Sequence, residues 1–150
     1  MAYLNFLVAA PEVDVLALSR DTSVVLEPSL VVAVSHLIGY WVEVQPLGKI
    51  VGQAVDGGLA VSPDLWHPLR QPVYHRAEAV QALHLQLVEE WERVLADKPV
   101  PEDDWYRIEI EKVLRLFRHA SDQTECVVSV LERPADHERA RRVRIPFKWK

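Results

Sequence analysis

One segment of the 150-residue sequence constrains the fold more than any other, the stretch from Ala77 to Leu95. Its apolar residues recur at helical spacing and so lie on one face of a helix. This stripe consists of Val80, Leu83, His84, Leu87, Trp91, Val94 and Leu95. Most of the stability of such a helix comes from packing its apolar face. The sequence therefore predicts a long amphipathic helix together with the core that it covers.

A second helix is expected directly afterwards. Lys98-Pro99-Val100-Pro101 ends the first helix, because proline cannot continue it. The carboxylates of Glu102, Asp103 and Asp104 favour the positive end of a new helix dipole. The residues expected to face the core are Trp105, Ile108, Val113, Leu116, Phe117 and Ala120. So short a connection predicts an antiparallel helix hairpin.

Three other segments read as strands. Tyr3 to Ala9 is a short apolar run, followed by a helix start at Pro11. Glu125 to Leu131 is nearly continuous in apolar and β-branched residues, which is typical of a central strand buried on both faces. From Val143 to Trp149 apolar residues alternate with cations, which predicts a half-buried antiparallel strand at the edge of a sheet.

Two segments are harder to assign. Leu30 to Val44 contains β-branched residues, yet its apolar spacing follows a helical face, so we expect a helix through about residue 38 and an extended segment over Tyr40 to Val44. Residues 46 to 72 are rich in glycine and proline and predict loops, with a turn at Asp56-Gly57-Gly58.

These elements predict a single α+β domain over residues 1–150, with an antiparallel or mixed β-sheet packed by a C-terminal antiparallel helix hairpin. Cys126 is the only cysteine, which excludes an internal disulfide and fits a reducing cytoplasm. The N-terminus lacks the features of a signal peptide. No run approaches the roughly 20 apolar residues of a membrane-spanning helix. We therefore expect a cytoplasmic protein without a membrane partner.

Charge is unevenly distributed along the chain. Residues 78–111 carry ten carboxylates and three cations, a balance of 3 − 10 = −7, whereas residues 112–150 have a balance of 10 − 5 = +5. The carboxylates that could form a partner-binding surface are Glu89, Glu90, Glu92, Asp97, Glu102, Asp103 and Asp104. A solvated helix hairpin accounts for them. The sharper hypothesis is docking to a basic protein, because clustered charge speeds encounter and rejects wrong partners.

The loop from Trp66 to His75 is the candidate ligand pocket. Its ring and donor groups are Trp66, His67, Arg70, Tyr74 and His75. A proline-rigid connection whose aromatic residues fill the core is the simpler interpretation.

No motif indicates catalysis. The six histidines form no His-x-x-x-His pair or cluster with Cys126, so neither a metal site nor a cofactor is expected. Ser121 and Asp122 near His119 read as ordinary residues of a helix end. No catalytic residue is therefore assigned.

The basic C-terminal strand is the candidate nucleic-acid site. Its cations include Arg142 and Arg144, and Phe147 and Trp149 could stack on bases. However, Phe147 and Trp149 alternate with the cations and would be buried on the opposite face of a strand. Together with the net charge of −5, this makes nucleic acid a weaker hypothesis than an edge strand.

A further pattern resembles a known family. It comprises Pro46-Leu47-Gly48, Gly52, Asp56-Gly57-Gly58 and Pro72-Val73-Tyr74-His75, then Trp105-Tyr106, Leu114 to Ala120 and Val127-Val128. Over about residues 28–132 it is similar to the YfbM-like family of uncharacterised bacterial proteins. The resemblance implies a small α+β fold and, since some relatives sit beside toxin genes, an immunity-like role. It implies no catalytic residues.

The leading functional hypothesis is a non-catalytic protein-binding module, an immunity or antitoxin-like inhibitor that masks a basic partner with an acidic helical surface. The alternative is a small-ligand-binding protein or enzyme that uses the Trp66 to His75 loop. A third is a nucleic-acid-associated protein that acts through the basic C-terminal strand.

Overall fold

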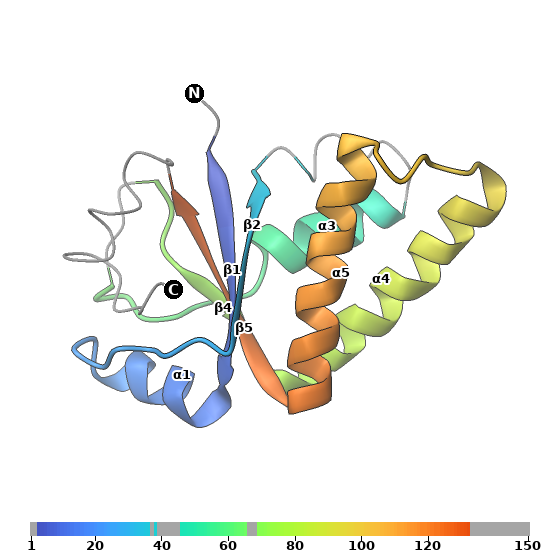
Figure 1. Cartoon of the computed structure of the whole chain (residues 1–150). Helices are drawn as coiled ribbons and strands as arrows, with labels where there is room; N and C mark the ends of the chain where they lie inside the picture. The colour runs from blue at the N-terminus through green and yellow to red at the C-terminus, as the bar shows by residue number, and fades with distance from the viewer. Residues whose placement is uncertain (1–2, 37, 39–45, 66–68, 133–150) are drawn as a thin grey trace.

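The computed structural model of the chain describes residues 3–36, 38, 46–65 and 69–132 (Figure 1). The elements are β1 (Leu4–Pro11), α1 (Glu12–Arg20), β2 (Leu30–Ser35), α3 (Leu47–Asp56), β3 (Leu59–Ala60), β4 (Val73–His75), α4 (Ala77–Asp97), α5 (Trp105–Gln123) and β5 (Glu125–Glu132). They form an α+β fold, which confirms the predicted class.

The strands form one sheet in the order β2-β1-β5-β4-β3, with every neighbouring pair antiparallel. β1 and β5 pair over their full length, from Leu4 opposite Glu132 to Pro11 opposite Glu125. The first six residues of β5 are all buried. The prediction of a central strand at Glu125 to Leu131 is therefore confirmed.

One face of the sheet is covered by α3, α4 and α5 (Figure 1). Alternation along the strands directs Leu7 of β1 and Val127 of β5 to this face. There they join a core that includes Leu87 of α4 and Phe117 of α5. The apolar stripe predicted from Ala77 to Leu95 thus lies on α4 and packs as expected.

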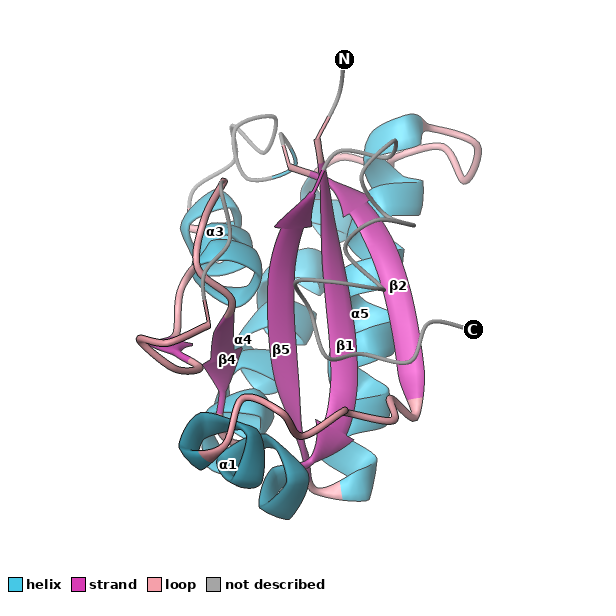
Figure 2. Cartoon of the chain, turned by 90° about the vertical axis from the view of Figure 1, so that its left-hand side faces the viewer, coloured by secondary structure: helices cyan, strands magenta, loops and turns pink. Residues whose placement is uncertain are grey.

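The other face carries a second, smaller core. Phe6 and Val8 of β1 and Val128 of β5 pack there with Leu18 of α1 and with Leu65. Figure 2 looks onto this face, with α1 across one end of it. The sheet is therefore buried on both faces near α1, which explains why β1 and β5 are apolar at consecutive positions.

The helix predicted over Leu30 to about residue 38 is wrong, because Leu30–Ser35 forms strand β2. Leu7 of β1 lies opposite Val32, and Asn5 lies opposite Val34. Both valines are buried on the helix-covered face. The segment forms a strand because it pairs with β1 and buries β-branched side chains at every second residue. These contributions outweigh the helical spacing of its apolar residues.

The middle of the chain is also more ordered than predicted, because residues 47–56 form helix α3. Leu47, Val51, Ala54 and Val55 are fully buried against the core. A glycine inside a helix costs only about 1 kcal/mol, so the burial of this face outweighs the glycines that suggested a loop. The predicted turn follows, with Gly58 at φ +107°.

The hairpin of α4 and α5 is present, and the two helices run in opposite directions (Figure 1). Asp104 caps α5, where its Oδ1 accepts a hydrogen bond from the Tyr106 amide at 2.9 Å. Thr124 ends the helix in the left-handed region at φ 54°. β5 begins at the next residue.

Some predictions fall outside the described residues. They are the extended segment over Tyr40 to Val44, Trp66 and His67 of the candidate pocket, and the basic strand with Arg142, Arg144, Val143, Ile145, Phe147 and Trp149. Within the part of the chain that the structure describes, no helix is long and apolar enough to cross a membrane.

Candidate functional site

The carboxylates predicted to bind a partner have different environments. Glu90 is only 8% exposed, and its Oε1 lies 2.8 Å from Arg93 Nη1 on the same helix. Including Glu90 in a docking surface is therefore wrong. Its neighbour Glu89 is exposed and lies 3.5 Å from Arg93 Nη2. Asp104 is exposed but caps α5.

The other four are Glu92, Asp97, Glu102 and Asp103. All four are exposed, and none forms an ion pair or side-chain hydrogen bond with another described residue. Over residues 89–108 the balance of charge is 3 − 7 = −4. The end of the hairpin therefore presents negative charge that the described part of the fold leaves unpaired.

Trp105 and Ile108 lie beside these carboxylates in the sequence and are 45% and 44% exposed. The prediction that they face the core is wrong. The buried arc of α5 is centred on Ile110, Val113 and Phe117, and the helical turn places positions 105 and 108 outside that arc. We call Asp97, Glu102, Asp103, Trp105 and Ile108 the hairpin-turn surface.

The connection that carries this surface is held in place. The rings of Trp91 and Tyr106 meet edge to face, with their centroids 5.8 Å apart. Arg107 Nη1 donates a hydrogen bond to the Val100 carbonyl at 2.6 Å, and its Nε donates to Glu111 at 2.8 Å. The ring contact therefore joins α4 to α5, and the Arg107 hydrogen bond joins α5 to the connection between them.

The candidate ligand pocket is only partly assembled. Tyr74 and His75 of β4 line an open groove of about 590 Å³, together with Gln53, Gly58, Leu59, Arg76, Glu78, Ala79 and Ala82. Arg70 is not among the residues that line the groove. The groove lies between the short edge strand β3 and the first half of α4.

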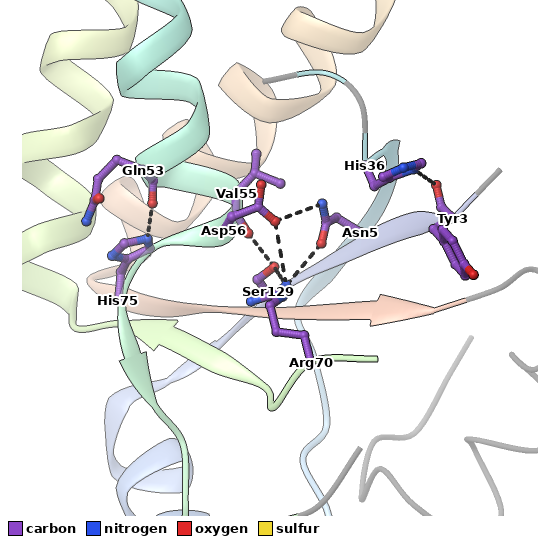
Figure 3. A network of polar contacts seen from close by, with 9 residues as sticks. All are labelled: Tyr3, Asn5, His36, Gln53, Val55, Asp56, Arg70, His75 and Ser129. Carbon is purple, nitrogen blue, oxygen red and sulfur yellow. Dashed lines mark hydrogen bonds and ion pairs between the residues drawn. The ribbon is translucent and has the colours of Figure 1, made fainter. Parts of the chain in front are cut away.

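Arg70 belongs instead to a polar network at the end of α3 (Figure 3). Its Nη2 donates to Asn5 Oδ1 at 3.1 Å and to Ser129 Oγ at 2.9 Å. Asp56 Oδ1 lies 4.0 Å from the same nitrogen. Burial lowers the pKa of Arg70. Its cation also lies at the negative end of the α3 dipole. We therefore interpret Arg70 as a structural residue that links the end of α3 to β1 and β5.

His75 has a structural role as well. Its Nε2 lies 2.9 Å from the carbonyl oxygen of Gln53, near the C-terminus of α3 (Figure 3). The residue is 5% exposed, and burial lowers the pKa of the imidazole below its usual value. This geometry indicates a neutral imidazole that donates a hydrogen bond to the C-terminal end of α3.

A third cluster joins residues far apart in the sequence. Ser29 Oγ lies 2.9 Å from His119 Nε2 and 2.7 Å from Glu125 Oε1. Glu125 Oε1 is 3.4 Å from the same His119 nitrogen. In a serine-hydrolase triad the acid bonds the other ring nitrogen, so this is not triad geometry. Sequence spacing could not reveal the cluster, because Ser29 precedes His119 by 90 positions.

Cys126 is fully buried in the smaller core. Burial raises the pKa of its thiol to about 11. The side chain therefore stays protonated near neutral pH, as expected for an inert core thiol. Among all the described residues, no three side chains of histidine, cysteine, aspartate or glutamate gather in a group that could hold a metal ion.

Comparison with protein-family models, with curated proteins and with solved structures found no match to this chain.

Proposed function

We propose that this chain is a non-catalytic protein-binding module that docks on a basic protein partner through the hairpin-turn surface. The observation that carries the proposal is the exposure of two apolar side chains at the start of α5, Trp105 and Ile108, directly after a connection whose carboxylates Asp97, Glu102 and Asp103 are also exposed and have no partner among the described residues. An immunity or antitoxin-like inhibitor that masks a basic partner is the form of this function that we favour.

The two parts of the surface would do different work. Tryptophan is among the side chains that contribute most to binding when a partner buries them. Surrounding carboxylates would attract a cationic partner and raise the association rate more than the affinity. A basic partner would also neutralise charge that the described part of the fold leaves unpaired.

The support beneath the surface favours binding without large rearrangement. The Trp91 and Tyr106 ring contact and the Arg107 hydrogen bonds hold the connection between α4 and α5. A surface that is already ordered loses little conformational freedom on binding. Membership of the YfbM-like family and a cytoplasmic location remain part of this proposal.

The test starts with capture of the partner on the tagged full-length chain, followed by titration of the purified pair. Asp103→Lys should weaken the complex by about tenfold, because one charge pair at an interface is worth on the order of 1.5 kcal/mol or more. Glu78→Lys is the matched control, since Glu78 is an exposed carboxylate at the other end of α4. Equal affinities for the two variants would contradict the proposal.

A second candidate function rests on the groove beside β4. The open groove of about 590 Å³, which Tyr74 and His75 help to line, has the volume of a small-molecule site. A ligand there would raise the melting temperature in a concentration-dependent way. Ala82→Trp, at an exposed lining position, should abolish that shift, whereas Asp103→Lys should leave it unchanged.

A further inference from the structure

The outer edge of β2 is covered by two side chains of α5. β2 is the last strand on its side of the described sheet, where β1 is its one neighbour (Figure 2). Lys112 Nζ donates a hydrogen bond to the Ala33 carbonyl oxygen at 3.3 Å, and Glu109 Oε2 accepts one from the Ser35 amide at 3.2 Å. We infer that Glu109 and Lys112 form an autoinhibitory contact that stops a second copy of this chain from pairing with β2.

The backbone groups that these side chains occupy belong to the free edge. The amide of His36, directly after β2, donates to the Tyr3 carbonyl at 3.2 Å and so points toward the chain that leads into β1. Along a strand the N–H and C=O groups of successive residues point to opposite sides. Those of Val31, Ala33 and Ser35 therefore point away from β1. An edge of this kind is a template for pairing with another chain.

The edge of β2 is complementary to itself. Every neighbouring pair in the described sheet is antiparallel, and two copies of β2 related by a two-fold axis would also pair antiparallel. With Ala33 opposite its counterpart, Val31 of one copy would lie opposite Ser35 of the other. All three outward-facing positions would then find hydrogen-bonding partners, so a second copy is the occupant that this edge fits.

The contact opposes that pairing in two ways. It occupies the Ala33 carbonyl and the Ser35 amide, which a second strand would need. It also places two charges at the edge, because Glu109 is 8% exposed and its Oε1 lies 3.1 Å from Lys112 Nζ. An incoming strand would separate these charges and remove them further from water, which is costly.

The position of the pair on α5 explains its reach. Glu109 and Lys112 are three residues apart on the helix, so their side chains leave it on the same side. Neither residue belongs to the hairpin-turn surface, so the inference does not depend on the proposed function.

The experiment is sedimentation velocity of the full-length chain over a wide range of concentrations. Glu109→Ala combined with Lys112→Ala frees the edge and leaves the net charge unchanged. This double variant should tighten self-association by about tenfold or more, because each freed backbone group can bond to the second copy. The matched control is Arg118→Ala combined with Asp122→Ala, which removes an exposed pair of opposite charges from the same helix. The control should associate no more than the wild type.

A second measurement does not depend on the folding of a variant. In the wild type, hydrogen exchange should be slow at the Ser35 amide, which Glu109 covers, and faster at the Ala33 amide. In the folded double variant, the Ala33 amide should become protected as the concentration rises. The inference is overturned if Ser35 exchanges as fast as Ala33 in the wild type, or if the folded double variant associates no more than the control.

Discussion

His75 Nε2 and the carbonyl oxygen of Gln53 are 2.9 Å apart and link β4 to the end of α3. A carbonyl oxygen can only accept a hydrogen bond, so Nε2 carries the hydrogen, and Nδ1 of the neutral ring has none. Ser129 of β5 makes a similar link, because its Oγ donates to the Val55 carbonyl. Two neighbouring strands thus donate to carbonyl groups at the C-terminal end of α3, where the Gln53 carbonyl also accepts the Gly57 amide at 3.1 Å.

The first prediction concerns pH. Burial lowers the pKa of His75 in the folded chain, whereas the unfolded imidazole titrates near its usual value of about 6.5. The unfolded state therefore binds more protons once the pH falls below about 6.5, so the free energy of unfolding should decrease there. His75→Gln keeps an N–H donor but cannot titrate, and it should flatten this dependence in urea unfolding at pH 7.5 and 5.5.

Part of the dependence should remain in that variant, because burial also lowers the pKa of His84. An unchanged slope in His75→Gln would show that the protonation of His75 is not coupled to folding.

The second prediction concerns two glycines. At Gly58, where φ is +107°, a Cβ would lie 2.6 Å from the Tyr74 carbonyl oxygen. Gly58→Ala should therefore destabilise the fold by about 1–3 kcal/mol. At Gly52, inside α3, a Cβ meets nothing within 4 Å, so Gly52→Ala should stabilise the fold by about 0.5–1 kcal/mol. Denaturant unfolding of both variants checks this, and effects of the same sign would contradict it.

The third prediction concerns Ser129, which is 2% exposed. Ser129→Ala removes a donor to Val55 and an acceptor for Arg70, whose Nε and Nη1 are already buried without partners. We expect a loss of about 1–3 kcal/mol in the free energy of unfolding. Ser19→Ala on α1 is the matched control and should change it by no more than about 0.5 kcal/mol. A loss of similar size in both variants would argue against the network.

The sequence predicts a helix or strand best where the spacing of its apolar residues fits only one of the two. The stripe of α4 and the apolar run of β5 lie where expected, and α5 starts directly after the three carboxylates that predicted a new helix. β2 was missed because valines support either a strand or a buried helix, and only its partner β1 decides between them. α3 was missed because its glycines outweighed the spacing of Leu47, Val51, Ala54 and Val55, which did carry the helical signal.

The candidate sites depend more on tertiary contacts. Exposed carboxylates could be read from the sequence, but the burial of Glu90 and the exposure of Trp105 depend on which arc of each helix faces the core. Arg70 contacts Asn5 and Ser129 across 65 and 59 positions, and Ser29 contacts His119 and Glu125 across 90 and 96 positions. Neither could be found from spacing along one chain.

The central claim is that the hairpin-turn surface binds a basic protein. The most direct test is the affinity of the captured and purified partner for Trp105→Ala, measured by calorimetry beside Leu85→Ala. Leu85 is the matched control, because it is 69% exposed on α4 and lies outside the surface. Trp105→Ala should weaken the complex by about 2 kcal/mol or more, close to thirtyfold, while Leu85→Ala binds like the wild type. Full affinity in folded Trp105→Ala would contradict the account.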